Sequence, residues 1–389
     1  MSDQRNFFAT AAKGTEDLVA GELRALGAGN VKETRAGVSF KGGFDIAYRA
    51  CLWSRIANRI LMPLAEIPVA DANQLYAGVQ KIPWLDHLAP DGTLVVDFSG
   101  TNAAIIHTHF GAQKAKDAVV DQIRTRTGRR PSVKMARPDI RINVYLYRDT
   151  AVVSLDLSGE SLHRRAYRTG HGKAPLKENL AAAILLRAGW PDIARGGGAL
   201  IDPMCGAGTL PIEAGLIAAD IAPGLLREYW GFNGWKQHRA PLWAGLVAEA
   251  KQRRVAGLRR VPPIRGYDNN AGAVSEARRN VRQAGLDGKV TIEKRDIADC
   301  VTEDNVQPGI VVVNPPYGER MGELTAVPAH YQELGSALKR CYAGWRAAVF
   351  TGAPEAAHHL GLQAHKTHTL YNGAIACKLL HYQLHPKRG

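Results

Sequence analysis

Apolar and polar positions in the second half of the chain follow two alternating patterns. Short apolar runs that predict buried strands occupy residues 199–201, 264–268, 290–296, 310–314 and 347–351. Helical spacing of apolar residues lies between them, at 209–219, 271–284 and 328–341. Strands and helices in this order predict a doubly wound, mostly parallel sheet, an α/β fold. Two later strand-like runs, at 366–371 and 375–382, predict an antiparallel hairpin that turns at Asn372-Gly373.

The first 160 residues mix short strands and helices without this regular alternation. Strands are expected at 7–11, 31–40, 94–98, 140–147 and 151–157, and helices after Thr15, at 44–60 and at 113–126. Such a mixture predicts an α+β domain that ends near residue 160. The segment 164–177 is polar, basic and rich in glycine, so we expect a linker there rather than part of a core. A helix over 176–186 follows it.

Length and composition fit an ordinary globular protein. A chain of 389 residues is long enough for two or three domains. No apolar run approaches the roughly 18 residues of a membrane span, and the N-terminus lacks the basic-then-apolar order of a signal peptide. The cysteines form no CxxC pair, which favours a reducing compartment and argues against a disulfide or zinc framework. They are Cys51, Cys205, Cys300, Cys341 and Cys377. We therefore expect a cytosolic, cytoplasmic protein.

The charge balance favours a polyanionic partner. Lysine and arginine number 50 against 36 acidic residues, which gives a formal charge of +14. Basic residues concentrate in 114–148, 163–177 and 251–265, and the last two stretches contain no acidic residue. One charged run is usually a solvated surface, but three such clusters favour binding to the phosphates of RNA or DNA. The candidate RNA-binding residues are Lys114, Lys116, Arg124, Arg126, Arg129, Arg130, Lys134, Arg137, Arg164, Arg165 and Arg168.

A glycine-containing loop between a predicted strand and a predicted helix is the candidate cofactor site. Gly206 and Gly208 allow a tight turn and the close approach of a ligand to the backbone. A dinucleotide-binding loop would have a third glycine where this chain has Pro211, and the carboxylate of Asp202 would repel its phosphates. That carboxylate favours a cation instead, such as the sulfonium and ammonium of S-adenosylmethionine. The loop residues expected to bind the cofactor are Asp202, Pro203, Met204, Cys205, Gly206, Gly208 and Thr209. Cys205 is less expected as a nucleophile, because the turn only requires a small residue.

Acidic side chains also end the next two predicted strands. Asp268 can accept hydrogen bonds from both ribose hydroxyls of the cofactor, and Asp296 from its adenine amine. Together with Asp202 and Asn314 they end four successive strands at one edge of the sheet, which favours S-adenosylmethionine over a nicotinamide cofactor. Residues 220–263 are more than a crossover between strands requires, so we expect a cofactor lid or an RNA contact there.

The sequence Asn314-Pro315-Pro316-Tyr317 carries the candidate chemistry. Two prolines prevent the strand from continuing, so the backbone leaves the sheet where α/β folds bind ligands. Asn314 Oδ1 and the Pro315 carbonyl can accept the two hydrogens of a planar amine, and the Tyr317 ring can stack on its base. Such acceptors would direct the lone pair of the amine nitrogen toward a methyl donor, so that catalysis is mainly positioning. Taken alone, the four residues also fit a strand that ends in a proline turn.

Together these motifs resemble those of the THUMP-containing rRNA guanine-N2 methyltransferases. The resemblance rests on residues 202–209 and 314–320 and covers nearly the whole chain. Further similar segments are Phe98-Ser99-Gly100, Lys114-Ala115-Lys116-Asp117-Ala118, Arg137-Pro138-Asp139-Ile140-Arg141, Leu155-Asp156-Leu157-Ser158-Gly159 and Lys177-Glu178-Asn179-Leu180-Ala181-Ala182. In the last of these, Asn179 stands where the family more usually has Thr. The resemblance is strongest to the enzymes that make N2-methylguanosine near the peptidyl-transferase region of 23S rRNA.

The resemblance implies a domain organisation and a substrate. It implies a ferredoxin-like part over 1–60, a THUMP RNA-binding part over 61–160, a linker over 161–175 and a Rossmann-like S-adenosylmethionine methyltransferase domain over 176–389, with an insertion at about 220–263. The implied substrate is a flipped-out guanine of structured 23S rRNA, with Asn314 and Tyr317 holding the base. Some members carry a second, fused methyltransferase domain that this sequence does not contain, so we expect none of that domain's activity.

Several other interpretations remain open at this stage. The same four-residue geometry serves the N6 amine of adenine in RNA or DNA, and a protein glutamine amide is a further candidate substrate. A non-catalytic RNA-binding protein is the alternative outside enzymology. Glu319 and Arg320 fit a loop brace, a base contact or a surface ion pair. We expect no metal, because no cysteine or carboxylate cluster completes a site with His358, His359, His365 and His368.

Overall fold

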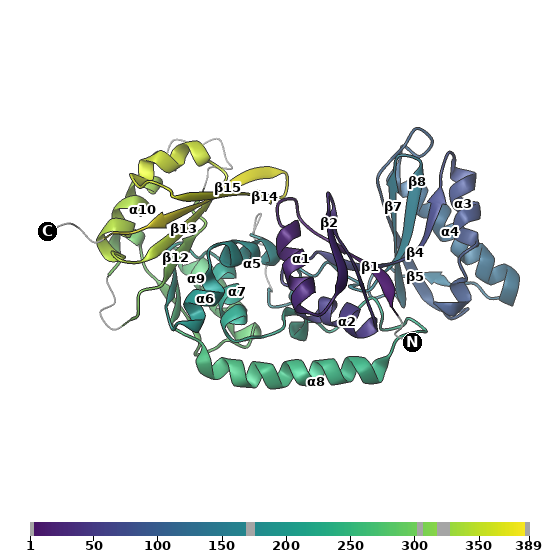
Figure 1. Cartoon of the computed structure of the whole chain (residues 1–389), viewed down its shortest axis with the longest axis horizontal. Helices are drawn as coiled ribbons and strands as arrows, with labels where there is room; N and C mark the ends of the chain where they lie inside the picture. Colours follow the sequence, from purple (N-terminus) through teal and green to yellow (C-terminus); the bar gives the residue numbers. More distant parts are fainter. Residues whose placement is uncertain (1–3, 169–175, 302–305, 317–326, 386–389) are drawn as a thin grey trace. The chain divides into compact units, whose positions relative to one another are not determined.

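The computed structural model describes residues 4–168, 176–301, 306–316 and 327–385, which form two compact units (Figure 1). The first unit comprises Met1–Ala11, Glu16–Arg164 and Arg227–Val247, and the second comprises Ala12–Thr15, Arg165–Leu226 and Ala248–Gly389. Tyr317, Glu319 and Arg320 lie outside the described residues. None of the helices in the described ranges has the length and apolar character needed to cross a membrane.

An eight-stranded sheet is the framework of the first unit, in the order β2-β3-β1-β4-β8-β7-β5-β6. Its strands are β1 (Arg5–Thr10), β2 (Gly29–Thr34), β3 (Gly37–Gly42), β4 (Arg59–Pro68), β5 (Thr93–Ser99), β6 (Ser132–Val133), β7 (Ile140–Tyr147) and β8 (Thr150–Asp156). Its helices include α1 (Glu16–Ala25), α2 (Phe44–Trp53), α3 (Ala72–Gln80), α4 (Thr108–Thr127) and the short η1 (Trp84–Asp86). Figure 1 shows α3 and α4 side by side on one face of the sheet, where they contact β4 and β5. The α+β prediction is confirmed.

Two elements of this unit differ from their sequence-based prediction. The strand predicted over 31–40 is a hairpin, because β2 and β3 pair in antiparallel fashion across a turn between Thr34 and Gly37. The helix predicted over 44–60 ends at Trp53 and is followed by strand β4. The cause of this early end is tertiary: the Glu22 carboxylate of α1 accepts hydrogen bonds from Ser54 Oγ (2.6 Å) and from the backbone N–H of Arg55 (2.9 Å).

The insertion divides between the two units rather than forming a separate lid. Residues 227–247 fold with the first unit, where the side chains of Trp230 and Trp235 are buried. The ring centroid of Phe232 lies 4.6 Å from that of Tyr48 on α2. The long helix α8 (Ala240–Gly257) and the short η3 (Leu258–Arg260) continue the chain into the second unit. The expectation of a surface lid or RNA contact is therefore wrong for Trp230 and Trp235, which pack in a core.

A seven-stranded sheet organises the second unit, in the order β11-β10-β9-β12-β13-β15-β14. Its strands are β9 (Leu200–Asp202), β10 (Ile264–Asp268), β11 (Val290–Lys294), β12 (Ile310–Val313), β13 (Arg346–Thr351), β14 (Lys366–Asn372) and β15 (Ile375–Gln383). The first five strands are parallel to one another, whereas β15 pairs in antiparallel fashion with β13 and β14. The predicted parallel sheet with an antiparallel C-terminal hairpin is confirmed.

Helices cover both faces of this sheet. They are α5 (Glu178–Arg187), α6 (Trp190–Arg195), α7 (Thr209–Ala218), α9 (Ala271–Gln283) and α10 (Val327–Cys341), with the short turns η2 (Pro223–Leu226), η4 (Ile297–Asp299) and η5 (Pro354–Leu360). Side chains of a strand alternate between faces, so Ile310 and Val312 join one hydrophobic cluster and Val311 and Val313 join another. A strand buried on both faces has to be apolar throughout, which explains the uninterrupted run Ile310–Val313.

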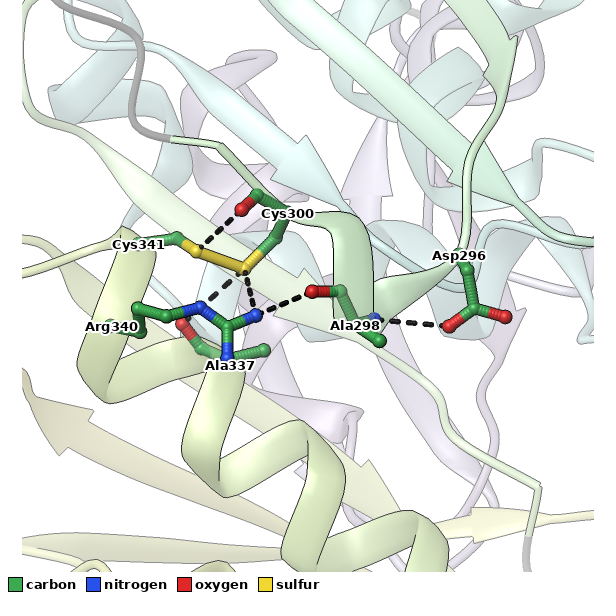
Figure 2. Close-up of a disulfide and its surroundings, with 6 residues drawn as sticks. All are labelled: Asp296, Ala298, Cys300, Ala337, Arg340 and Cys341. Carbon is green, nitrogen blue, oxygen red and sulfur yellow. Dashed lines mark hydrogen bonds between the residues drawn. A yellow bond between two sulfur atoms is a disulfide. The ribbon is translucent and has the colours of Figure 1, made fainter.

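A disulfide joins two cysteines that the sequence had led us to expect as free thiols. Cys300 follows η4 and Cys341 is the last residue of α10, and their sulfur atoms are bonded across 41 residues (Figure 2). Arg340 lies over this bridge and donates a hydrogen bond to the carbonyl oxygen of Ala298 at 2.6 Å. The expectation of no disulfide was wrong because spacing along the chain carries no signal when only folding brings two elements together. Cys51, Cys205 and Cys377 are free and buried.

Candidate active site

The second sheet reverses its direction of winding beside its central strand. From β9 the chain continues to β10 and β11 on one side of the sheet and then crosses over to β12 and β13 on the other side of β9. Ligands of open α/β sheets bind at such a reversal, outside the carboxyl ends of the strands. Asp202 is the last residue of β9 and Asn314 directly follows β12. The two side chains therefore flank the place in the fold where a ligand is expected.

The loop from Asp202 to Thr209 is held by hydrogen bonds to neighbouring strand ends. The N–H of Cys205 donates to the carbonyl oxygen of Tyr267 (2.8 Å), and the N–H of Gly206 donates to Asp268 Oδ2 (2.9 Å). Gly208 caps α7 with a φ of 82°, a left-handed conformation that glycine adopts without strain. A side chain there would also meet the Cβ of Ala277 at 3.1 Å. Gly208 therefore serves the tight turn that the sequence predicted and also packs closely against α9, whereas the approach of a ligand to the two glycines stays a prediction.

The Asp268 carboxylate braces this loop and keeps acceptor capacity free. Its Oδ2 accepts the Gly206 N–H, and its Oδ1 accepts the N–H of Asn270 at 2.9 Å. Each carboxylate oxygen can accept more than one hydrogen bond, so both oxygens retain a lone pair for a ligand hydroxyl. Asn280 of α9, which is fully buried, adds a hydrogen bond from Nδ2 to the carbonyl oxygen of Ala207 at 2.9 Å. Sequence reasoning missed Asn280, whose polar side chain on an apolar helix face was the available signal.

The third acidic residue lies beyond β11 and is linked to the end of β10. Asp296 Oδ2 accepts a hydrogen bond from Asn269 Nδ2 at 3.1 Å, and Oδ1 accepts the N–H of Ala298 at 3.0 Å (Figure 2). The Ala298 N–H and the Asn269 amide lower the pKa of Asp296, so this carboxyl group is charged at neutral pH. Asn269 was not among the predicted residues, although it directly follows Asp268 at a strand end.

Burial makes Asp202 electrostatically unusual. Its side chain is almost fully buried, and its Oδ1 accepts a hydrogen bond from the N–H of Met204 at 3.2 Å. Burial raises the pKa of Asp202 well above its ordinary range, and the nearby charge of Asp268 adds to the rise. The pKa of the Cys205 thiol is also raised well above its ordinary range, mainly by burial. Cys205 is thus neutral, which agrees with its expected role as a small loop residue.

Asn314 presents a buried acceptor with no partner. Its Oδ1 is inaccessible to solvent and makes no hydrogen bond within the described ranges, which end at Pro316 on this side. A buried polar atom without a partner costs about 1–3 kcal/mol, so a ligand that donates a hydrogen bond to Asn314 Oδ1 would recover that free energy. Pro315, which follows, is buried, and Pro316 is exposed. The unpartnered oxygen is the observation that best fits a site for an amine.

These residues fit S-adenosylmethionine better than a dinucleotide. A cationic ligand stabilises the ionised form of a buried carboxyl group whose pKa is high, and Asp202 is such a carboxyl group at the loop. Asp268 and Asp296 provide further oxygen acceptors at the two adjacent strand ends. Pyrophosphate would instead approach the carboxyl groups of Asp202 and Asp268 and would bring them no positive charge. The donor set therefore matches a cationic, hydroxyl-bearing cofactor.

Most of the predicted RNA-binding residues are accessible. The exposed ones are Arg124, Arg126, Arg129, Arg130, Lys134, Arg137 and Arg164, whereas Lys114 and Lys116 are half-buried. Arg129 and Arg137 make exposed ion pairs with Asp91 (3.5 Å) and Glu228 (2.8 Å). For Arg126, no acidic group lies within 4 Å in the described part of the chain. The end of α4 and the loop after it thus form a basic surface.

Arg165 corrects the sequence-based expectation, whereas the RNA contact expected of the half-buried Arg168 stays a prediction. Arg165 is 1% exposed, and its Nε lies 3.4 Å from Oε1 of the buried Glu213 on α7. Arg168 Nε lies 3.2 Å from Glu178 Oε1, and its Nη2 donates to the carbonyl oxygen of Leu176 at 2.6 Å. The prediction that Arg165 contacts RNA is wrong, because a buried guanidinium with a buried partner cannot reach a phosphate. The predicted linker likewise contributes the buried Arg165 and Tyr167 to the core.

Two histidines near the C-terminus, His368 and His381, lie within hydrogen-bonding distance of each other. His368 Nδ1 lies 2.9 Å from His381 Nε2, between the two strands of the hairpin. Burial lowers the pKa of His381 to about 4, with the neighbouring histidines adding to the effect. No group of three or more potential ligand side chains able to hold a metal occurs in the parts of the chain that the structure describes.

Three family models match consecutive parts of the chain. A model for an RMKL-like methyltransferase domain matches residues 165–381, more than half of the chain. A model for the RlmL ferredoxin-like domain matches residues 6–61, and a model for the THUMP domain matches residues 69–156. The matches follow the two halves that the hydrophobic pattern distinguishes.

Whole proteins of known name are also similar. The chain is 55% identical over 384 residues to the ribosomal RNA large subunit methyltransferase K/L of Syntrophotalea carbinolica, covering 98% of this chain and 54% of the relative. This chain thus spans about half the length of the curated relatives it matches. Among solved structures, SMU.472 in complex with SAH is 30% identical with a TM-score of 0.85 and full coverage of both chains. A structure from Listeria monocytogenes, described as that of a predicted N6-adenine-specific DNA methylase, is 30% identical with a TM-score of 0.84, covering 98% of this chain and 96% of the other.

Proposed function

The chain belongs to the RMKL-like methyltransferase family, and ferredoxin-like and THUMP domains precede its methyltransferase domain. We propose that it methylates the exocyclic N2 amine of guanosine 2445 in 23S rRNA. The methyl donor is S-adenosylmethionine, which supplies a methyl group on a positively charged sulfur. We infer that the enzyme acts in the cytoplasm. The relatives named for large-subunit rRNA support the substrate class.

The unpartnered oxygen of Asn314 is the observation that carries the proposal. A guanine amine that donates one hydrogen to Asn314 Oδ1 satisfies this atom, and the other hydrogen is offered to the carbonyl oxygen of Pro315. Two acceptors on one amine hold its nitrogen in place and draw its lone pair out of conjugation with the ring. Positioning of this kind lowers the barrier without a strong base. Tyr317, which lies outside the described residues, is proposed to stack on the guanine.

The acidic residues have separate roles in this proposal. Asp202 holds the cationic end of the cofactor in a buried setting, and Asp268 holds the ribose hydroxyls. Asp296, charged and kept in place by Asn269, accepts from the adenine amine. Pro203, Met204, Cys205, Gly206, Gly208 and Thr209 form the loop that allows the cofactor to approach the backbone. The basic surface at the end of α4 holds the RNA.

Adenine N6 is the second candidate acceptor for the methyl group. An amide oxygen and a proline carbonyl accept hydrogens from any planar amine, and the similar structure from Listeria monocytogenes is named for adenine. The two amines are separated by the chemistry of the product. Incubation of the purified chain with labelled S-adenosylmethionine and a 23S rRNA fragment, followed by digestion to nucleosides, distinguishes N2-methylguanosine from N6-methyladenosine.

A substrate analogue and a variant complete this test. Replacing the target guanosine by inosine removes only the N2 amine, and we expect it to abolish methylation. The variant Asn314→Ala is expected to lose at least a hundredfold in rate while retaining cofactor affinity, and Asn73→Ala, an exposed asparagine on α3, is the matched control. Full activity of Asn314→Ala, or N6-methyladenosine as the product, overturns the proposal.

A further inference from the structure

The disulfide between Cys300 and Cys341 has no part in the site described above, yet it lies next to a residue of that site. Only the three residues of η4 separate Cys300 from Asp296, the proposed acceptor for the adenine of the cofactor. Figure 2 shows the bridge and Asp296 on opposite sides of η4. Cys341 is the last residue of α10, so the bridge ties η4 to that helix.

The turn η4 depends on support from outside itself. At its start, Asp296 Oδ1 accepts the N–H of Ala298 at 3.0 Å. At its end, the N–H of Cys300 donates to the carbonyl oxygen of Ile297 at 3.2 Å. A single turn of this kind is not stable alone. Helix α10 restrains it through the bridge and through the hydrogen bond from Arg340 to the Ala298 carbonyl oxygen at 2.6 Å. Asp296 shares this support, because it caps the turn.

The two bridged sulfur atoms have different surroundings. Cys300 is half-buried, whereas Cys341 is 3% exposed. Arg340 Nη2 lies 3.5 Å from Cys300 Sγ, and a guanidinium at this distance favours a thiolate there once the bridge is reduced. The carbonyl groups at the C-terminal end of a helix disfavour an anion, which holds Cys341 as a thiol. Cys300 is therefore the sulfur that exchanges with small molecules, and Cys341 closes the bridge.

The cysteine content agrees with a bridge that opens and closes. The spacing of the cysteines favours a reducing compartment, where disulfides are usually transient rather than structural. The other three cysteines are Cys51, Cys205 and Cys377, and all are free and buried. A half-buried sulfur beside a cation is the kind that responds to the balance of small thiols and disulfides.

We propose that Cys300 and Cys341 form a reversible thiol–disulfide switch that sets the affinity of the second unit for S-adenosylmethionine through η4 and Asp296. The inference rests on the proposed function, which assigns Asp296 to the cofactor, and adds regulation to it. In the bonded state η4 is fixed, so Asp296 is in place before the cofactor binds. In the dithiol state cofactor binding has to order the turn as well, which costs free energy. Asn269 still holds the Asp296 carboxylate, so affinity falls without being lost.

The change of state is an exchange with a small-molecule disulfide such as oxidised glutathione. The Cys300 thiolate attacks one sulfur of that disulfide, which forms a mixed disulfide and releases one small thiolate. The Cys341 thiol then gives up its proton and attacks the Cys300 sulfur, which closes the bridge and releases the second small thiolate. Two cysteine thiols lose two electrons, one small disulfide is reduced to two thiols, and these take up the two protons. Reduction follows the same steps in reverse.

The test measures binding of S-adenosylmethionine to the full chain by calorimetry, once after oxidation and once after reduction with a phosphine. We expect the oxidised chain to bind about five- to tenfold more tightly. The double variant Cys300→Ser, Cys341→Ser should bind as the reduced chain does and should not respond to oxidant. Cys377→Ala removes a free cysteine of the same unit and is the matched control, which should keep the full response. Circular dichroism shows that the reduced chain and each variant are folded.

Thermodynamic linkage provides a second measurement on the unchanged sequence. A ligand that binds the bonded state more tightly must favour that state by the same factor. Saturating S-adenosylmethionine should therefore raise, by about five- to tenfold, the equilibrium constant for bridge formation against glutathione. The bonded fraction is measured across a series of ratios of reduced to oxidised glutathione, by alkylation of free thiols and mass spectrometry.

The outcomes separate this inference from the proposed function. Equal affinity of the oxidised and reduced chains overturns the switch. A bridge that stays bonded in the folded chain at every glutathione ratio also overturns it, because the disulfide is then structural only. Asp296→Ala tests the proposed function by itself and should weaken cofactor binding about tenfold in both redox states. Unchanged binding by that variant refutes the assigned role of Asp296, whereas weakened binding together with equal affinity of the two redox states refutes the switch alone.

Discussion

The buried ion pair between Arg165 and Glu213 leads to a sharp prediction for the methyltransferase unit. Glu213 lies on α7, the helix that begins at the proposed cofactor loop, and both side chains are at most 1% exposed. Arg165 Nε lies 3.4 Å from Glu213 Oε1, and the Tyr167 hydroxyl donates to the same oxygen at 3.2 Å. Arg165→Ala leaves the Glu213 carboxylate in the core without its cation. Its neighbour Arg164 is exposed and pairs at 3.6 Å with exposed Glu160, so it provides a matched control one residue away.

The size of the effect follows from burial. Removing one partner of a buried ion pair destabilises a protein by about 3–5 kcal/mol, because the remaining charge has lost its solvation and its counter-charge. Tyr167→Phe removes only one neutral donor and should cost about 1 kcal/mol. Arg164→Ala removes an exposed pair that contributes less than about 1 kcal/mol. The predicted order of destabilisation is therefore Arg165→Ala, then Tyr167→Phe, then Arg164→Ala.

Hydrogen–deuterium exchange of the α7 amides measures the destabilisation locally, so the assay does not depend on both units unfolding together. We expect the amides of Thr209–Ala218 to exchange at least a hundredfold faster in Arg165→Ala than in Arg164→Ala. In an RNA-binding assay the ranking should reverse, since only Arg164 is exposed. The reasoning is refuted if both arginine variants change exchange equally, or if Arg165→Met combined with Glu213→Leu, which removes both charges, is less stable than Arg165→Ala alone.

Three further predictions follow from charge and cross-linking. Burial raises the pKa of Asp202 above its ordinary 3.8, so the contribution of this group to stability is full below pH 3.8 and declines as pH rises through the raised pKa. Without cofactor, Asp202→Asn should therefore be more stable than the unchanged protein at pH 7, and thermal melts should show that this advantage disappears near pH 4. The same variant should lose cofactor binding, as measured by calorimetry. The Cys300–Cys341 disulfide closes a 41-residue loop and should stabilise the second unit by about 4 kcal/mol. Reductant should therefore lower the urea concentration at the midpoint of unfolding, and the double variant Cys300→Ser, Cys341→Ser should no longer respond to reductant. A response to reductant that persists in the double variant would contradict this prediction. Arg130→Ala should reduce the slope of RNA affinity against salt by about one phosphate contact, measured by filter binding, and an unchanged slope would place the RNA elsewhere.

Local pattern determined the fold class and the position of the ligand-binding edge. Strands buried on both faces have to be apolar throughout, so an apolar run such as Ile310–Val313 can be recognised as a buried strand from the sequence alone. A carboxylate or amide side chain directly after such a run must lie at the edge of the sheet where the strand ends. The same holds for the loop after Asp202, whose glycines are required by its own turn. These features depend on residues close together in the chain, and sequence can express them fully. Whether the edge binds the proposed cofactor and base stays a prediction.

Tertiary structure decided what depends on partners far along the chain. Arg164 and Arg165 are chemically identical neighbours, and only the position of Glu213, 48 residues later, makes one of them a core residue. Cys300 and Cys341 are bonded although 41 residues separate them in the chain. Helix α2 ends early because Glu22 of α1 accepts a hydrogen bond from the backbone that follows it. Trp230 is buried because its segment folds with the first unit. Burial and charge pairing are properties of the completed packing, so no window of sequence contains them.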